Sequence, residues 1–171
     1  MGTLSLRALI DVLEKNQRVQ RIARPVDRNW EPGCLVKWMF HGLADDQRFG
    51  LIFENVTGSR FPLATALLGS SRFAYATALR VDPDDINRAW VEALLKPIPA
   101  ALTERAGSQE VVLRGDEVKL SDLPIPVWTP GKDAGPYITT PVMTKNADTG
   151  VQNLGVYRTQ VLGDTSVVVN L

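Results

Sequence analysis

The segment Gly150-Val-Gln-Asn-Leu-Gly-Val-Tyr-Arg-Thr-Gln160 places several polar side chains in an otherwise apolar, strand-like sequence. An arginine such as Arg158 is costly to bury without a partner, and its forked N–H groups suit a carboxylate or a phosphate. Gly155 inside the strand pattern indicates a bulge or a ligand that approaches the backbone closely. On the pattern alone, the competing interpretation is an edge strand with one solvated face.

Strand-like sequence surrounds this segment. Apolar and β-branched residues dominate residues 138–144, 151–162 and 166–171. Residues 146–150 have turn composition and predict a hairpin between the first two runs. Because the sequence stops within an apolar run, the β region is expected to be incomplete or to be completed by another chain.

A proline-rich stretch precedes the strand-like region. Prolines recur at positions 124, 126, 130, 136 and 141, which excludes a continuous helix or a central strand. The texture predicts three parts: an N-terminal α/β lobe over residues 1–100, a crossing segment over 101–137, and the start of a β-rich domain over 138–171.

The N-terminal lobe is expected to mix helices and strands. Helices are predicted after a Thr3 or Ser5 cap, from about Pro32 to Gly42, and from a start at Asp82-Pro83, where Asp82 would cap. The expected strands are Arg18–Ile22 ending at Pro25, Leu51–Phe53 and Leu63–Leu68.

Composition excludes several classes of function. Lys plus Arg and Asp plus Glu both number 19, so there is no electrostatic footprint for nucleic acid or an anionic membrane. No apolar stretch reaches the roughly 20 residues that cross a bilayer. A single cysteine, Cys34, fits the reducing cytoplasm. Cys34 and His41 fall on one expected helix, where packing is favoured over a nucleophile pair.

Seven blocks of the sequence, taken in their order along the chain, resemble the UbiD decarboxylase family. Asn153-Leu-Gly-Val-Tyr-Arg158 is similar to its "NxGIYR" cofactor motif, with Val156 in place of isoleucine, and Leu51-Ile-Phe-Glu-Asn-Val-Thr-Gly58 to its "LFENVxG" block. The other blocks are Arg21–Asp27, Leu68–Arg72 followed by Ala78-Leu79, Gln109–Leu113, Leu120–Pro126 and Asp133–Thr140. Any one block is weak, but their colinear order over nearly the whole chain is a strong signal.

The resemblance implies a fold, a cofactor and residue roles. The β region would be the first strands of a flavin-reductase-like split barrel. Prenylated FMN would be the cofactor, with a divalent metal, Mn or Mg, and possible involvement of K⁺. Asn153 would bind the metal. Val156, Tyr157 and Arg158 would contact the cofactor, and Arg158 would also be catalytic by holding the substrate carboxylate.

The function implied is reversible decarboxylation of aromatic or α,β-unsaturated carboxylic acids. The family's remaining ligands and glutamates have no counterparts here, so the rest of the enzyme or a second subunit is the expected partner, together with homo-oligomerisation. The alternative is a noncatalytic structural or regulatory subunit that keeps the family fold.

Asn153 and Arg158 are five positions apart and face opposite sides of an ideal strand, so a broken strand at Gly155 is predicted.

Overall fold

The computed structural model describes residues 4–99, 101–104 and 106–169. The chain forms two compact units, each assembled from three segments. Unit 1 comprises Met1–Ile22, Val36–Ile52 and Ala64–Gly115, and unit 2 comprises Ala23–Leu35, Phe53–Leu63 and Asp116–Leu171. The mixed helix and strand character predicted from the sequence is confirmed. The predicted boundaries at residues 100 and 137 stay predictions.

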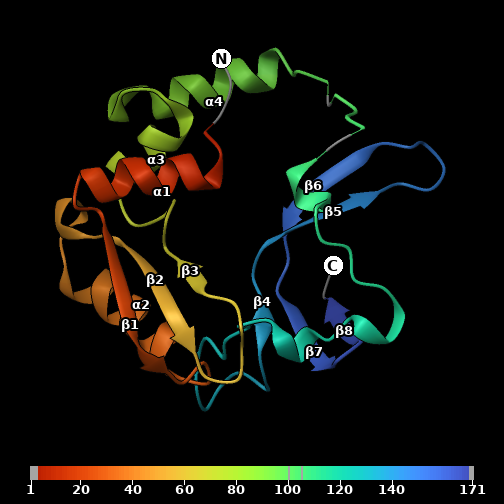
Figure 1. The fold of residues 1–171 in the computed structure, drawn as a ribbon. Coiled ribbons are helices and arrows are strands. Elements are labelled where there is room, and N and C mark those ends of the chain that lie inside the picture. Colours follow the sequence, from red (N-terminus) through yellow and green to blue (C-terminus); the bar gives the residue numbers. More distant parts are fainter. Residues whose placement is uncertain (1–3, 100, 105, 170–171) are drawn as a thin grey trace. The chain divides into compact units, whose positions relative to one another are not determined.

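Three helices of unit 1 pack in sequence order. Helix α3 (Arg72–Leu79) contacts both α1 (Leu6–Lys15) and α4 (Ile86–Leu95), as Figure 1 shows. The spacing of the apolar residues in α1 buries its Leu9 and Leu13 against Leu67 and Ala74. This cluster is the hydrophobic core of the unit.

The helix starts follow local capping. Ser5 caps α1, because its hydroxyl accepts a hydrogen bond from the Ala8 amide at 3.2 Å. Thr3, the other predicted cap, lies outside the described residues. The predicted helix start at Asp82-Pro83 is confirmed as a 3₁₀ turn, Pro83–Asp85, which has Asp82 at its N-cap position and leads into α4. The Asp82 side chain makes no capping hydrogen bond, so only that part of the prediction is wrong.

The sequence pattern did not predict α3. Ser71 caps it through a hydrogen bond from the Ala74 amide at 3.2 Å, and Arg80 ends it in the left-handed conformation with φ of 58°. A non-glycine residue in that conformation gives no sequence signal for a helix end. The predicted strand over Leu63–Leu68 is correspondingly shorter, with β3 covering only Leu63–Thr65.

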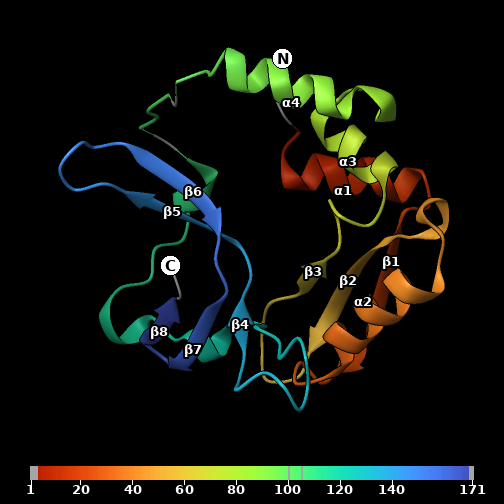
Figure 2. The same ribbon diagram turned by 180° about the vertical axis from the view of Figure 1, so that it is seen from behind.

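A three-stranded sheet has the order β1 (Val19–Val26), β2 (Gly50–Val56), β3. Helix α2 (Glu31–Gly42), close to its predicted bounds, lies along β1 and β2 in both views (Figures 1 and 2). The prediction that the first strand ends at Pro25 is wrong, because β1 includes this proline. An edge strand tolerates proline, since one of its backbone sides has no partner strand.

Unit 2 carries two small sheets. Strands β4 (Tyr137–Ile138), β7 (Thr159–Gly163) and β8 (Ser166–Val169) form an antiparallel sheet in the order β4-β7-β8. The three strands lie together in both views (Figures 1 and 2). Strands β5 (Pro141–Lys145) and β6 (Gln152–Val156) form the predicted hairpin. A flavin-reductase-like barrel stays a prediction, since both sheets are open.

Side-chain hydrogen bonds and a glycine stabilise the turn of the β5–β6 hairpin. The side-chain oxygen of Asn146 accepts hydrogen bonds from the amides of Asp148, at 3.0 Å, and Thr149, at 2.8 Å. Gly150 closes the turn with φ of +70°, a conformation that glycine adopts without steric cost. The turn therefore fixes the register that pairs Lys145 with Gln152.

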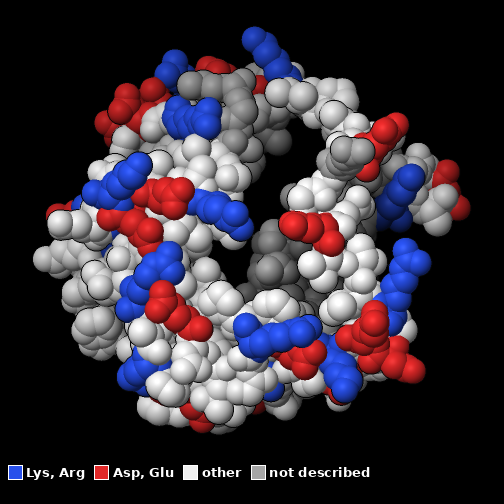
Figure 3. Space-filling model, in the orientation of Figure 1, with Lys and Arg blue, Asp and Glu red and all other residues white. Residues whose placement is uncertain are grey.

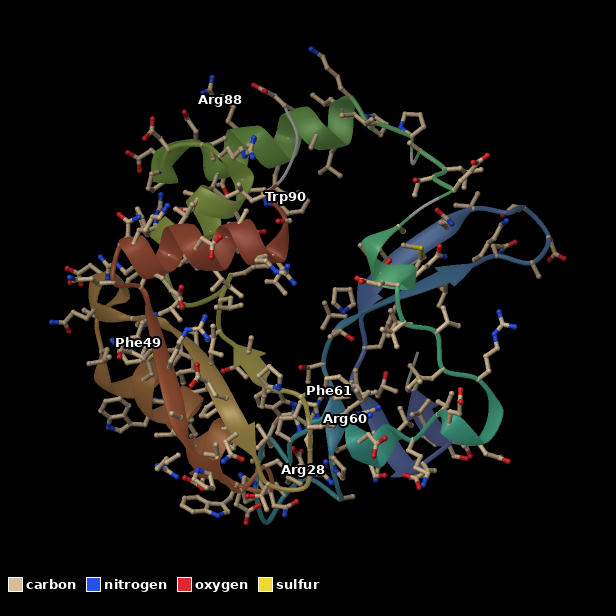
Figure 4. All side chains as sticks on the ribbon, in the orientation of Figure 1. Arg28, Phe49, Arg60, Phe61, Arg88 and Trp90 are labelled. Atoms are coloured by element: carbon tan, nitrogen blue, oxygen red, sulfur yellow. The ribbon has the colours of Figure 1, made fainter. Side chains whose placement is uncertain are left out.

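The proline-rich crossing is held by backbone groups within unit 2. Arg28, labelled in Figure 4, donates to the carbonyl oxygens of Ser121 at 3.1 Å and Leu123 at 2.8 Å. The Trp128 indole donates to the Tyr137 carbonyl at 2.9 Å. A Cβ atom on Gly33 would lie 2.4 Å from the Trp128 carbonyl oxygen, so this glycine permits the close approach.

Charges of both signs are interspersed over the face shown in Figure 3. None of the described helices is long and apolar enough to cross a membrane.

Candidate functional site

The predicted site residues lie where the chain passes from one sheet to the other. Strand β6 ends at Val156 and β7 begins at Thr159, so Tyr157 and Arg158 belong to neither strand. The predicted strand break exists, but its predicted position is wrong. Gly155 stays in regular register opposite Val142, and the break follows it by two residues.

Asn153, Gly155 and Tyr157 share one side of the chain, as strand alternation requires. The side-chain nitrogen of Asn153, Nδ2, donates to the Tyr157 hydroxyl at 3.2 Å. The Tyr157 ring folds back over Gly155, where a Cβ atom would lie 2.4 Å from the ring. The glycine therefore makes room for an aromatic side chain of its own segment rather than for a bulge.

The side chain of Val156 faces the other way. It is 71% exposed and lies on the same face as Leu154, two positions earlier in β6, and as Pro141 and Met143 across the hairpin. Val156 and Asn153 therefore do not present their side chains to the same side. Val156 can therefore contact a group bound beside the Asn153 side chain only through its backbone atoms.

Arg158 points toward the proline-rich crossing. One of its terminal nitrogens lies 2.8 Å from a carboxylate oxygen of Asp133, whose side chain is only 6% exposed. Its guanidinium carbon lies 4.2 Å from the centre of the Tyr137 ring. The Arg158 side chain is 52% exposed, so part of the guanidinium faces solvent.

Asp133 is held independently of Arg158. Its second carboxylate oxygen accepts a hydrogen bond from the Thr129 amide at 2.8 Å, which closes the turn from Thr129 to Asp133. Burial alone would raise the pKa of Asp133. The hydrogen bonds from Arg158 and from the amides of Thr129 and Trp128, with the Arg158 charge, outweigh burial and hold this pKa below its usual range. Asp133 is therefore ionised at neutral pH.

The donor set suits an anion and a hard cation. Among the described residues, one Arg158 nitrogen has a hydrogen-bond partner, which leaves further N–H groups for a carboxylate or phosphate. The side-chain oxygen of Asn153, Oδ1, accepts no hydrogen bond from a described residue. An oxygen of this type is a ligand that Mg²⁺ or Mn²⁺ takes. These groups fit a flavin phosphate with its metal, but they form only part of such a site.

No complete metal site exists within the described part of the chain. A group of three or more His, Cys, Asp or Glu side chains in ligand geometry does not occur there. Cys34 and His41 are both exposed, so the packing role predicted for them is wrong. A metal held at Asn153 would need ligands from elsewhere.

Two cavities lie away from the predicted residues. In unit 1, a cavity of about 360 Å³ is bordered by Asp45, Ser71, Arg72, Tyr75 and Asp84 among others. In unit 2, one of about 270 Å³ is bordered by Arg28, Ser121, Pro136 and Asp164 among others. Neither is lined by a residue of the Asn153–Arg158 segment, which is an open arrangement on the surface of unit 2.

The sequence pattern missed the partners of Arg158. It gives Asp133 only as the start of a family-like block, and in the structure Asp133 caps the turn that begins at Thr129. The pairing across 25 residues was not foreseen. The available signal was the cost of an unpaired arginine in a strand, which requires a carboxylate without identifying which one.

Two sequence families match the chain. The family described as 3-octaprenyl-4-hydroxybenzoate carboxy-lyase N-terminal domain (UbiD_N) matches residues 10–94. The family described as 3-octaprenyl-4-hydroxybenzoate carboxy-lyase Rift-related domain (UbiD) matches residues 101–171. The second match contains Asp133, Tyr137 and the whole Asn153–Arg158 segment.

Relatives and solved structures agree with these matches. An uncharacterized protein of Synechocystis sp. is 30% identical over an alignment 190 residues long. The alignment covers 96% of this chain and 37% of the relative. The UbiD-class enzyme HmfF from Pelotomaculum thermopropionicum, in complex with FMN, superposes with a TM-score of 0.84 at 30% identity, covering 97% of this chain and 36% of that one. An evolved dimeric form of HmfF in complex with prFMN gives 0.85 and 31%, covering 98% and 38%. The chain thus spans between 36% and 38% of the length of these proteins.

Proposed function

The chain belongs to the UbiD carboxy-lyase family, and from this premise we propose that it supplies part of the active site of a prenylated-FMN-dependent decarboxylase. The proposed reaction is the reversible loss of carbon dioxide from aromatic or α,β-unsaturated carboxylic acids. The observation that carries the proposal is Arg158, which is anchored on one edge by Asp133 and partly exposed on the rest.

Each residue of the segment has a proposed task. Arg158 binds and orients the substrate carboxylate through the N–H groups that Asp133 leaves available. The Asn153 oxygen binds a divalent metal, Mn or Mg, alongside the flavin phosphate. Tyr157 and the backbone of Val156 border the cofactor, with which K⁺ is also proposed to associate. When bound, the prenylated flavin accepts the electrons that the breaking carbon–carbon bond releases.

The other half of the site is proposed to come from outside the 171 residues. The chain provides one amide oxygen and one arginine, whereas a metal and a flavin phosphate need several more ligands. The remaining part of the enzyme or a second subunit supplies these groups, within a homo-oligomer. An evolved form of HmfF, which has a similar structure, is dimeric.

The experiment starts with protein purified anaerobically together with any polypeptide that accompanies it. Native mass spectrometry reports bound flavin and partners, and carbon dioxide release is then measured over a panel of unsaturated and aromatic acids with prenylated FMN. We expect flavin binding and turnover in the wild type and the Arg88→Ala control, whose arginine lies in α4 of unit 1 (Figure 4). We expect Arg158→Ala to lose about 10²- to 10³-fold in rate, the range for removing one preorganised donor. Flavin-free, inactive protein under these conditions would leave the noncatalytic subunit as the function.

A further inference from the structure

We propose that Asp133 and Tyr137 are positioning residues that orient the Arg158 guanidinium from two directions. Asp133 fixes one edge of the guanidinium plane, and the Tyr137 ring supports one face of it. The inference rests on the proposed function for its purpose, which is to present Arg158 to a carboxylate. Its geometry stands on the structure of unit 2 alone.

Arg158 needs external support because no strand orders it. It lies between β6 and β7, outside both ladders, and its side chain has several rotatable bonds. An arginine that is 52% exposed in such a position would sample many rotamers. A group that must meet a reacting carboxylate works best when its orientation is set before binding.

The Asp133 side chain is held in place by hydrogen bonds within its own turn. The Thr129 amide donates to one carboxylate oxygen, and the Asp133 amide in turn donates to the Thr129 carbonyl at 2.9 Å. The other carboxylate oxygen is thereby aimed at Arg158. Since the side chain is 6% exposed, water competes little for that oxygen.

The Tyr137 support is fixed by the β4–β7 sheet. Tyr137 pairs with Gln160 in the ladder, and its hydroxyl donates to the Gln160 side-chain oxygen at 3.3 Å. Its carbonyl accepts from the Trp128 indole at 2.9 Å. Its ring is therefore held under Arg158, and a guanidinium over an aromatic face gains cation–π attraction.

The competing account is an incidental surface ion pair. The chain contains such a pair: Arg88 and Asp85 are 2.8 Å apart at the start of α4, with side chains 67% and 40% exposed. The Arg158 pair differs from it by its buried carboxylate, its second carboxylate bond and its aromatic support. These three features serve orientation, which an incidental pair does not need.

The first test is a double-mutant cycle on kcat/KM, made with the assembled, cofactor-loaded protein. Asp133→Asn keeps the shape of the side chain and removes its charge. We expect it to lower kcat/KM about 10- to 100-fold in the wild type, as expected for a displaced catalytic group. In the Arg158→Met background the same change should cost less than about threefold, because no cation remains there for Asp133 to orient. Equal losses in the two backgrounds would overturn the proposal.

The second test needs no activity. In protein labelled with ¹⁵N arginine, the Arg158 Nε–H signal is identified by its absence in Arg158→Lys. We expect Tyr137→Leu to shift this signal by removing the ring current, and Tyr137→Phe to retain it. Asp133→Asn should shift it too, whereas the control Asp85→Asn should shift only Arg88. An Arg158 signal that ignores Asp133→Asn and Tyr137→Leu contradicts the proposal even if the enzyme is active.

The two tests separate two failures. Wild-type protein that carries prenylated FMN but decarboxylates nothing overturns the proposed function, while the expected NMR shifts still support the positioning of Arg158. Turnover without those shifts supports the function and overturns the positioning role.

Discussion

Two ion pairs of equal length occupy very different places in this molecule. Arg158–Asp133 and Arg88–Asp85 both have a nitrogen–oxygen distance of 2.8 Å. The side chain of Asp133 is 6% exposed and that of Asp85 is 40% exposed. Arg88 projects from the first turns of α4, three positions from its partner, whereas Arg158 reaches a partner 25 positions away. Distance alone therefore does not distinguish a positioned arginine from a solvated one, and the surroundings of the carboxylate do.

The largest difference is expected when each arginine is removed. Arg158→Met leaves a buried carboxylate with only amide donors, so the free energy of unfolding should fall by about 1–2 kcal/mol, the lower part of the usual range because Arg158 is half-exposed. Arg88→Met should cost less than about 0.5 kcal/mol, as exposed helix pairs do. Urea denaturation of both variants measures this. Equal losses would remove the distinction between the pairs.

Acid should weaken the Arg158–Asp133 pair. The pKa of Asp133 is lowered in the folded protein by Arg158 and backbone amides despite burial, so its stabilisation is complete above the unfolded-state pKa, near 4. It is lost as the pH falls through the lower folded-state pKa. The free energy of unfolding should therefore decline more steeply below pH 4 in the wild type than in Asp133→Asn. Parallel pH profiles from chemical denaturation would show that Asp133 does not titrate in this way.

A smaller contrast concerns the aromatic partners of arginine. Arg158 lies 4.2 Å from the Tyr137 ring centre, and the 63% exposed Arg60 lies 5.1 Å from that of Phe61 (Figure 4). Double-mutant cycles on stability should give a coupling of about 0.5–1 kcal/mol for the first pair and less for the second, which is more solvated. A coupling at Arg60–Phe61 as large as at Arg158–Tyr137 would contradict this ranking.

A small stability effect is expected at Gly155. A methyl group there meets the far end of the Tyr157 side chain, which can swing away, so Gly155→Ala should cost less than about 1 kcal/mol. The displaced ring should lose its bond to Asn153, while the Arg158–Asp133 coupling stays unchanged on the other side. Gly163→Ala, with open space around it, is the matched control. A changed Arg158 coupling would show that the two sides of the segment are not independent.

Sequence reasoning reached furthest where a local rule decides the structure. Ser5 capping, the bounds of α2 and the β5–β6 hairpin follow from capping, periodicity and turn chemistry over a few residues. Prediction from the sequence failed where contacts with distant parts of the chain determine the local structure. α3 ends at Arg80 without a glycine, and β1 continues through Pro25 because it is an edge strand.

The candidate site shows the same division. The polar residues in an apolar strand identified the segment, and the opposite directions of Asn153 and Arg158 predicted a break. The break lies at Tyr157–Arg158 because Gly155 accommodates the Tyr157 ring and keeps its place in the ladder. The identity of Asp133 as the partner of Arg158 depends on tertiary folding, which no local pattern contains.

The two-residue passage between β6 and β7 also limits how far the site can come apart. Three Cα–Cα steps join Val156 to Thr159 and span at most about 11 Å, so the ends of the two ladders stay close even when the contacts around them open. Covalent connection thereby sets the effective concentration of Asn153 and Arg158 near one another, independently of any bound group. Two groups that we propose to bind a metal and a carboxylate share this short tether, so they come back together in a unimolecular event, at a rate that dilution does not change.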